Sequence, residues 1–192
     1  RFNIAFLRGT DVCMLKWVLT FLVVAFAMVL WRMAAAAKRN LPAVGDEAPA
    51  FELPDQDGNA RSLSEFRDKW LVLYFYPRDD TPGCTTQACH FRDDSGSLES
   101  LGAVVCGVSV DDSESHADFA RTHKLPFTLL ADRGGKTAAQ YGSLWNFGLI
   151  KVAKRNTFLI DPKGRVARVY LSADPVRNSS QVITDLRQLQ RN

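Results

Sequence analysis

The hydrophobic and polar positions divide the chain at about residue 40. Trp17–Trp31 reads WVLTFLVVAFAMVLW without a charged side chain, whereas apolar and polar positions are mixed after Asn40. Such a run is typical of a membrane segment, although it is shorter than the roughly 20 residues that span a bilayer comfortably. We therefore expect an N-terminal apolar segment over residues 1–40 and one globular domain over residues 41–192.

Two short apolar runs within the globular part predict strands that are buried on both faces. These are Leu71–Tyr76 (LVLYFY) and Ala103–Val110 (AVVCGVSV). Between them, Thr81 and Pro82 are the start signals of a helix that we expect to end near Gly102. Strand, helix and strand in this order predict a parallel crossover unit.

The second half of the chain repeats this alternation and then changes. We expect helices over Ser113–Thr122, Gly135–Tyr141 and Pro175–Leu189, and strands over Phe127–Leu130, Thr157–Ile160 and Val166–Leu171. The turn at Asp161–Gly164 joins two of the strands into an antiparallel hairpin. Parallel units followed by a hairpin, with helices on both faces, predict an α/β fold, namely a thioredoxin-like three-layer α/β/α sandwich with a central mixed sheet.

The apolar N-terminal segment has two interpretations. It is a membrane anchor that Met33–Ala37 extend if Arg32 snorkels, or a secretory signal peptide cleaved among the alanines that precede Lys38. Met14 is a candidate start, which would place residues 1–13 upstream of it. The basic residues then lie mainly after the apolar run, which predicts a membrane-anchored domain on the cytoplasmic face, with export as the alternative.

Charge and cysteine usage exclude several classes of protein. The net charge of +3 comes from basic and acidic residues that are interspersed, so no nucleic-acid partner is expected. The cysteines form neither a dense disulfide framework nor the paired CxxC knuckles of a zinc site, and they lie at positions 13, 84, 89 and 106. Cys13 and Cys106 have apolar neighbours and are interpreted as buried packing residues.

Cys84 is the most distinctive candidate for chemistry. It occupies the third position of the predicted helix, where unpaired backbone N–H groups and the positive end of the helix dipole favour a thiolate. Thr81 can cap the helix and place its hydroxyl near the sulfur, while Pro77 and Pro82 stiffen the loop. The sequence therefore predicts a reactive nucleophile at Cys84.

The loop around Cys84 resembles that of a known family. PRDDTPGC has the P-x3-T-x2-C pattern of peroxiredoxins directly after an apolar strand, and Tyr74–Asp94 (YFYPRDDTPGCTTQACHFRDD) is most similar to their bacterioferritin comigratory protein, or peroxiredoxin Q, branch. Pro42–Pro77, Gly107–Asp132 and Lys154–Val166 resemble the same branch. The resemblance covers about residues 42–190, which is nearly all of the globular part.

The resemblance implies an enzyme, a thioredoxin-dependent peroxidase that reduces hydrogen peroxide and organic hydroperoxides in antioxidant defence and redox homeostasis, without a cofactor or metal. Cys84 would be the peroxidatic cysteine and Cys89 the resolving cysteine. Thr81 and Arg155 would activate the thiol, and Pro77 would shield it. Thioredoxin or a similar dithiol protein would reduce the Cys84–Cys89 disulfide, and a resolving cysteine in the same chain is compatible with a monomer.

The spacing of Cys84 and Cys89 predicts a change of shape. On an intact helix their Cα atoms would be roughly 8 to 9 Å apart, whereas a disulfide accepts at most about 7 Å. The helix must therefore unwind at its first turns for the bond to form. Between them, Gln87 stands where the resembling family commonly has Glu, a loss of charge that would change the surroundings of the thiolate or the ease of unwinding.

Two alternatives remain open. A membrane-anchored thioredoxin-fold copper chaperone would use two cysteines and a distant histidine, but the spacing here is C-x4-C rather than C-x3-C. A thiol-disulfide oxidoreductase would need CxxC, whereas residues 84–87 read CTTQ. His90, His116 and His123 have no ligand-like spacing and are interpreted as solvated helix residues.

Overall fold

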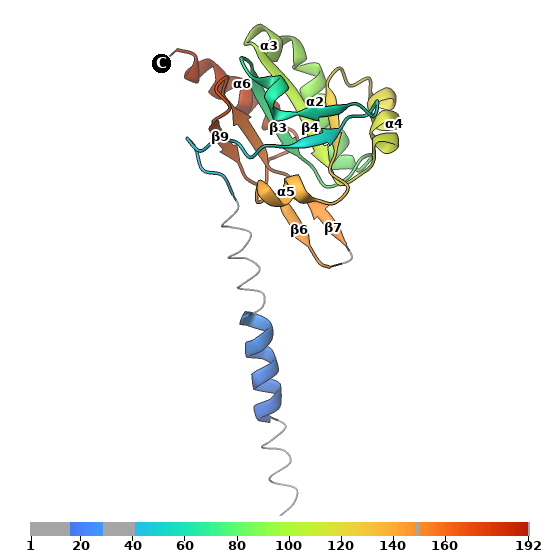
Figure 1. The fold of residues 1–192 in the computed structure, drawn as a ribbon, viewed down its shortest axis with the longest axis vertical. Coiled ribbons are helices and arrows are strands. Elements are labelled where there is room, and N and C mark those ends of the chain that lie inside the picture. Colours follow the sequence, from blue (N-terminus) through green and yellow to red (C-terminus); the bar gives the residue numbers. More distant parts are fainter. Residues whose placement is uncertain (1–15, 29–40, 149, 192) are drawn as a thin grey trace, which may run out of the picture. The chain divides into compact units, whose positions relative to one another are not determined.

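The computed structural model describes residues 16–28, 41–148 and 150–191 of the chain (Figure 1). The chain divides into two units, with the boundary between residues 39 and 40. In the first unit, residues 16–28 form a helix. The second unit carries the remaining described elements.

The predicted membrane anchor and the localisation built on it are wrong. Across the described residues, no helix combines the length and apolar character that crossing a membrane requires. Cys13 and residues 29–40, into which the predicted anchor extends, lie outside the described residues.

A five-stranded mixed sheet forms the centre of the second unit, in the order β5-β4-β3-β8-β9. β3 (Trp70–Phe75) pairs in parallel with β4 (Ala103–Ser109), which pairs in parallel with β5 (Thr128–Ala131). On its other side β3 pairs antiparallel with β8 (Thr157–Ile160), which continues antiparallel to β9 (Val166–Tyr170). The predicted change from parallel units to an antiparallel hairpin is confirmed.

Side chains of β3 alternate between two hydrophobic clusters, because successive residues of a strand point to opposite faces. Val72 and Tyr74 pack in one cluster with α2 (Pro82–Asp93) and α6 (Asn178–Leu189). The same cluster includes residues of α3 (Ser95–Ser100) and α4 (Ser113–His123). The β3 strand therefore anchors one helical layer directly.

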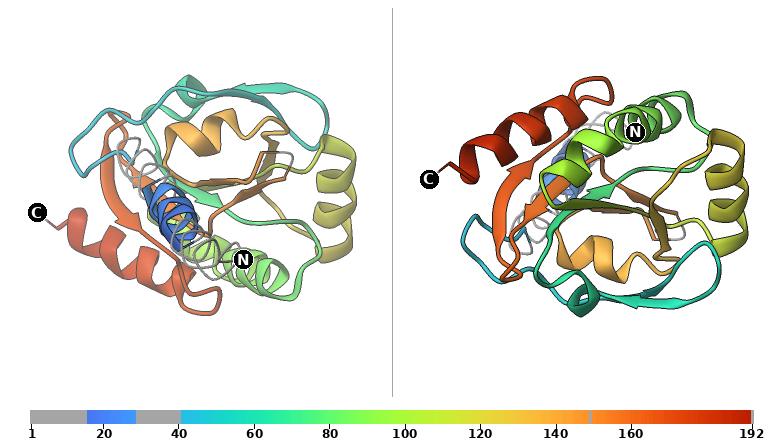
Figure 2. Two further views of the ribbon diagram at one scale, coloured as in Figure 1. Left: turned by 90° about the horizontal axis from the view of Figure 1, so that it is seen from below. Right: turned by 90° about the horizontal axis from the view of Figure 1, so that it is seen from above.

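Leu71, Leu73 and Phe75 of β3 pack in the opposite cluster. This second layer contains α5, the 3-10 helix η1 and the hairpin of β1 and β2, with bounds Lys136–Gln140, Leu63–Phe66, Glu52–Pro54 and Ala60–Ser62 respectively. Helices cover both faces of the sheet (Figure 2). The structure confirms the predicted thioredoxin-like three-layer α/β/α sandwich.

Two predicted helices differ from those observed. The long helix expected after Thr81 breaks at Asp94 (φ −90°, ψ 3°), so that α2 and α3 are separate. The Ser-Gly-Ser sequence that follows has low helix propensity, and the break lets Leu98 reach the core. α6 begins at Asn178 rather than Pro175, because the Asp174 carboxylate accepts hydrogen bonds from the next backbone N–H groups in a turn.

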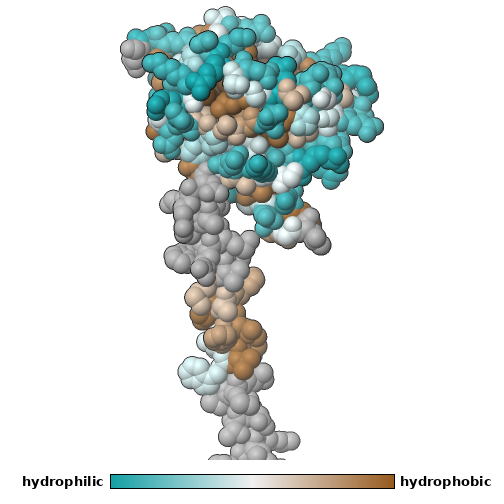
Figure 3. All heavy atoms as spheres, viewed as in Figure 1, coloured by the Kyte–Doolittle hydropathy of each residue, from teal (hydrophilic) through white to brown (hydrophobic). Residues whose placement is uncertain are grey.

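The hairpin of β6 (Leu144–Asn146) and β7 (Lys151–Ala153) was not predicted. Its sequence does not alternate, and Trp145 and Phe147 are exposed on it. Such exposure is unusual here, since the face of the domain seen in Figure 3 is mostly hydrophilic. β7 leads, after one intervening residue, to Arg155.

Candidate active site

Cys84 lies in the first turn of α2, and the loop of residues 76–81 connects β3 to this helix. Thr81 is the N-cap residue, with an extended backbone (φ −84°, ψ 144°), and Pro82 is the first helical residue, which its fixed φ suits. The Cys84 side chain is 1% exposed. The sulfur therefore lies at the positive end of a helix and away from bulk water, as predicted.

Arg155 makes the closest polar contact with the sulfur. Its Nη2 donates a hydrogen bond to Cys84 Sγ at 3.3 Å, and its Nη1 donates to Gln87 Oε1 at 2.7 Å and to the Gly83 carbonyl at 3.3 Å. A Cβ atom at position 83 would lie 3.1 Å from Nη2, so glycine leaves room for the guanidinium. Three hydrogen bonds from one planar guanidinium thus fix its position against the thiol.

Gln87 holds the other side of this guanidinium, a role that the sequence analysis missed. Its side chain is fully buried, and its Nε2 donates to Asn178 Oδ1 at 2.9 Å. The same Asn178 oxygen accepts a hydrogen bond from Thr157 Oγ1 at 2.7 Å. The signal was present in the sequence, since Gln87 follows Cys84 by one helical turn and so shares its face.

Thr81 and Pro77 lie in the loop, but the structure gives Thr81 a different contact from the predicted one. Its Oγ1 donates to the Arg78 carbonyl at 3.0 Å, and its side chain makes no cap hydrogen bond. The expected side-chain cap is therefore wrong, because the hydroxyl closes the loop where the chain turns at Asp80 (φ 54°). Pro77 is half-buried at the start of the loop.

Cys89 is half-buried on the same helix, and α2 is continuous between the two cysteines, both of which are free thiols. Their Cα atoms are thus separated by roughly 8 to 9 Å of intact helix. Cys106 is buried in β4, as predicted, and burial raises the pKa of its thiol to about 12. In the described part of the chain, no three side chains of His, Cys, Asp or Glu gather as metal ligands.

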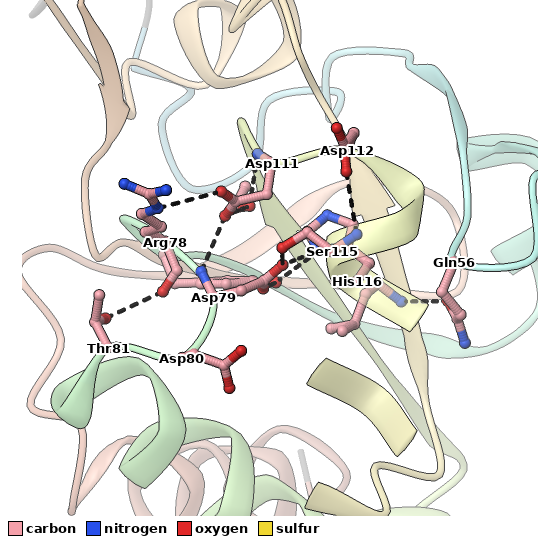
Figure 4. A network of polar contacts seen from close by, with 12 residues as sticks. Gln56, Arg78, Asp79, Asp80, Thr81, Asp111, Asp112, Ser115 and His116 are labelled. Carbon is pink, nitrogen blue, oxygen red and sulfur yellow. Dashed lines mark hydrogen bonds and ion pairs between the residues drawn. The ribbon is translucent and has the colours of Figure 1, made fainter. Parts of the chain in front are cut away.

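His116 is fully buried, so its interpretation as a solvated residue is wrong. Its Nδ1 lies 2.8 Å from Asp79 Oδ2, in the loop before Cys84 (Figure 4). Asp79 also accepts hydrogen bonds from Tyr76 Oη and Ser115 Oγ, each at 2.7 Å. Burial acts to raise the pKa of Asp79, but the bond and charge of His116, with the other two donors, leave that pKa below its ordinary value of 3.8.

This lowered pKa predicts how stability depends on pH. The charged Asp79 carboxylate stabilises the fold fully above its ordinary pKa, and that stabilisation is lost as the pH falls through the lowered value. Asp79→Asn should reduce the free energy of unfolding by about 3 kcal/mol near neutral pH, and the difference from wild type should narrow in acid. Urea unfolding of both proteins at a series of pH values, from neutral pH into acid, measures this difference in the free energy of unfolding. Asp118→Asn, at an exposed ion pair, should change stability by less than about 1 kcal/mol; a difference at Asp79 that is constant with pH would contradict the assignment.

The chain is similar to several known proteins. Residues 44–169 match the AhpC/TSA family. The chain is 47% identical over 127 residues to the chloroplastic peroxiredoxin Q of Populus jackii, a match that covers 66% of this chain and 59% of that protein, so it spans less than two thirds of that relative. It is 42% identical over 151 residues to peroxiredoxin Bcp of Bacillus subtilis, covering 74% and 96% of the two chains. The crystal structure of peroxidoxin BcpB from Mycobacterium tuberculosis superposes with a TM-score of 0.74 at 36% identity, covering 77% and 98%.

Proposed function

Because the chain belongs to the AhpC/TSA family, within its peroxiredoxin Q and Bcp branch, we propose that it is a thiol peroxidase that reduces hydrogen peroxide and organic hydroperoxides. The observation that carries this proposal is the 3.3 Å contact from Arg155 Nη2 to the buried Cys84 sulfur at a helix N-terminus. The family match does not favour the copper chaperone or the thiol-disulfide oxidoreductase.

In the first step, the Cys84 thiolate attacks one oxygen of the peroxide. A sulfur–oxygen bond forms while the oxygen–oxygen bond breaks, and the leaving oxygen takes a proton to become water or an alcohol. Arg155 can stabilise the negative charge that develops on the leaving oxygen, because its guanidinium is already fixed by Gln87 and the Gly83 carbonyl. Cys84 is left as a sulfenic acid. Pro77 and the buried position of the thiol limit the access of water.

In the second step, the Cys89 thiol attacks the sulfur of the sulfenic acid. The disulfide forms and the hydroxyl group leaves as water. Since both cysteines lie on continuous α2, the first turns of the helix must unwind, which breaks the contacts of Gln87 with Arg155 and Asn178. Thioredoxin or a similar dithiol protein would then reduce the disulfide, and all steps can take place in a monomer. Such turnover would serve antioxidant defence and redox homeostasis.

Oxidation by one equivalent of peroxide should yield the Cys84–Cys89 disulfide together with faster amide hydrogen exchange over residues 84–89. Peptide mass spectrometry identifies the bond, and exchange in the reduced and oxidised protein measures the helix. Cys89→Ser should instead retain a sulfenic acid at Cys84 that dimedone traps. An oxidised protein that carries the disulfide with unchanged protection of α2 would refute the unwinding step.

A further inference from the structure

Helix α4 contacts the loop before Cys84 at two successive acidic residues. His116 Nδ1 lies 2.8 Å from Asp79 Oδ2, and His123 Nε2 lies 3.2 Å from Asp80 Oδ1. The two histidines are seven residues apart, which is about two helical turns, so they lie on the same face of α4. Neither histidine takes part in the bond-making steps proposed above.

Asp79 is buried, and both its side chain and its backbone make hydrogen bonds that hold it in place. Its carboxylate accepts hydrogen bonds from Tyr76 and Ser115 in addition to the contact with His116. Its backbone N–H donates to Asp111 Oδ2 at 2.9 Å (Figure 4). A residue held in this way has little freedom to move relative to α4.

The contact with Asp80 lies where the backbone of the loop is left-handed. Asp80 has a φ of 54°, a left-handed conformation that disfavours residues with a Cβ atom, although Asp tolerates it better than most. Its partner His123 packs its ring against Phe119, with the ring centroids 5.0 Å apart. The His123 carbonyl also accepts a hydrogen bond from Arg92 Nη1 of α2 at 2.7 Å. His123 therefore connects α4 both to the loop and to the helix that carries Cys84.

We propose that His116 and His123 are positioning residues of the peroxidase reaction. They fix Asp79 and Asp80, and through the three residues between Asp80 and Cys84 they hold the Cys84 sulfur in line with Arg155. They also keep the loop in place when the first turns of α2 unwind, so that the helix re-forms in the same position after reduction. This inference rests on the proposed peroxidase function.

Side-chain mimics separate the contact from the mere presence of an imidazole. The amide nitrogen of Asn can replace His Nδ1, and that of Gln can replace His Nε2, so His116→Asn and His123→Gln should each keep the contact, whereas His116→Leu and His123→Leu remove it. The second-order rate constant of Cys84 with hydrogen peroxide is compared with its alkylation rate by iodoacetamide, which does not require alignment of an oxygen–oxygen bond with Arg155.

We expect the two leucine variants to react with peroxide about tenfold to a hundredfold more slowly than wild type, with alkylation changed less than about threefold and with most of the peroxide rate restored in the mimics. His123→Leu is decisive if His116→Leu does not fold, because His123 is partly exposed. A peroxide rate in His123→Leu equal to wild type would overturn the proposal. So would equal losses in His123→Leu and His123→Gln, or a parallel loss of both reactions.

Amide hydrogen exchange over residues 78–84 makes failure of this inference distinguishable from failure of the proposed function. If the wild-type protein does not consume peroxide, the proposed peroxidase function is refuted. Amide hydrogen exchange alone then tests whether α4 holds the loop in place. Exchange should be more than about tenfold faster in His123→Leu than in His123→Gln. Equal protection in these two variants would show that His123 does not hold the loop.

Discussion

Cys84→Ser is expected to lower the rate of peroxide consumption by at least about a thousandfold, the largest effect that we predict for a single side chain. The hydroxyl of serine is not deprotonated near neutral pH, so neither the helix N-terminus nor Arg155 can convert it into a comparable nucleophile. The measurement is peroxide consumption with a thioredoxin system as the reductant, together with a single-turnover assay that uses no reductant.

Cys106→Ser is the matched control for this loss. Cys106 is also a buried free thiol, but burial raises its pKa to about 12, so that it remains protonated near neutral pH. We expect this variant to consume peroxide at the wild-type rate if it folds. Peroxide consumption that survives Cys84→Ser and disappears in Cys106→Ser would identify Cys106 as the nucleophile and refute the role proposed for Cys84.

Arg155→Met should slow the reaction of Cys84 with peroxide by about a hundredfold to a thousandfold, the second largest effect. The substitution removes the donor to the sulfur and the charge that faces the developing alkoxide or hydroxide. Arg155→Lys should recover only part of the rate, because one ammonium group cannot contact Cys84 Sγ, Gln87 Oε1 and the Gly83 carbonyl with the geometry of the planar fork. Stopped-flow measurement of the second-order rate constant tests both variants.

Arg165 provides the control for the arginine series. It is exposed, and its Nη1 donates to the Gly45 carbonyl near the start of β9. Arg165→Lys should leave the peroxide rate unchanged. If Arg155→Lys reacts as fast as wild type, the guanidinium geometry does not matter and charge alone supports the reaction.

The layers of the fold followed from sequence because their signals are local. The apolar runs that became β3 and β4 are each continuous, and Thr81-Pro82 marks the start of α2 at the observed residue. The end of that helix was misplaced, since the break at Asp94 brings Leu98 onto β4, which is a tertiary requirement. The β6–β7 hairpin was missed because three-residue strands carry too little pattern to detect.

The site residues that were predicted are those that lie in a recognisable motif or in a segment that resembles the family. The motif and the family resemblance singled out Cys84 and Arg155, and the structure brings these two side chains together. The pairing of Gln87 with Asn178 links positions 91 residues apart, and that of His116 with Asp79 links positions 37 apart. No periodicity connects such pairs, so a buried histidine and a solvated one look alike in the sequence.

The antiparallel pairing of β8 with β3 means that the two sides of the site are made at different times during synthesis. Cys84 leaves the ribosome 71 residues ahead of Arg155, and Arg155 precedes β8 in the chain. A nascent chain that has made only β3 and α2 therefore carries an ordinary cysteine without its guanidinium partner. The contact between Arg155 and Cys84 therefore forms only after synthesis has passed residue 155.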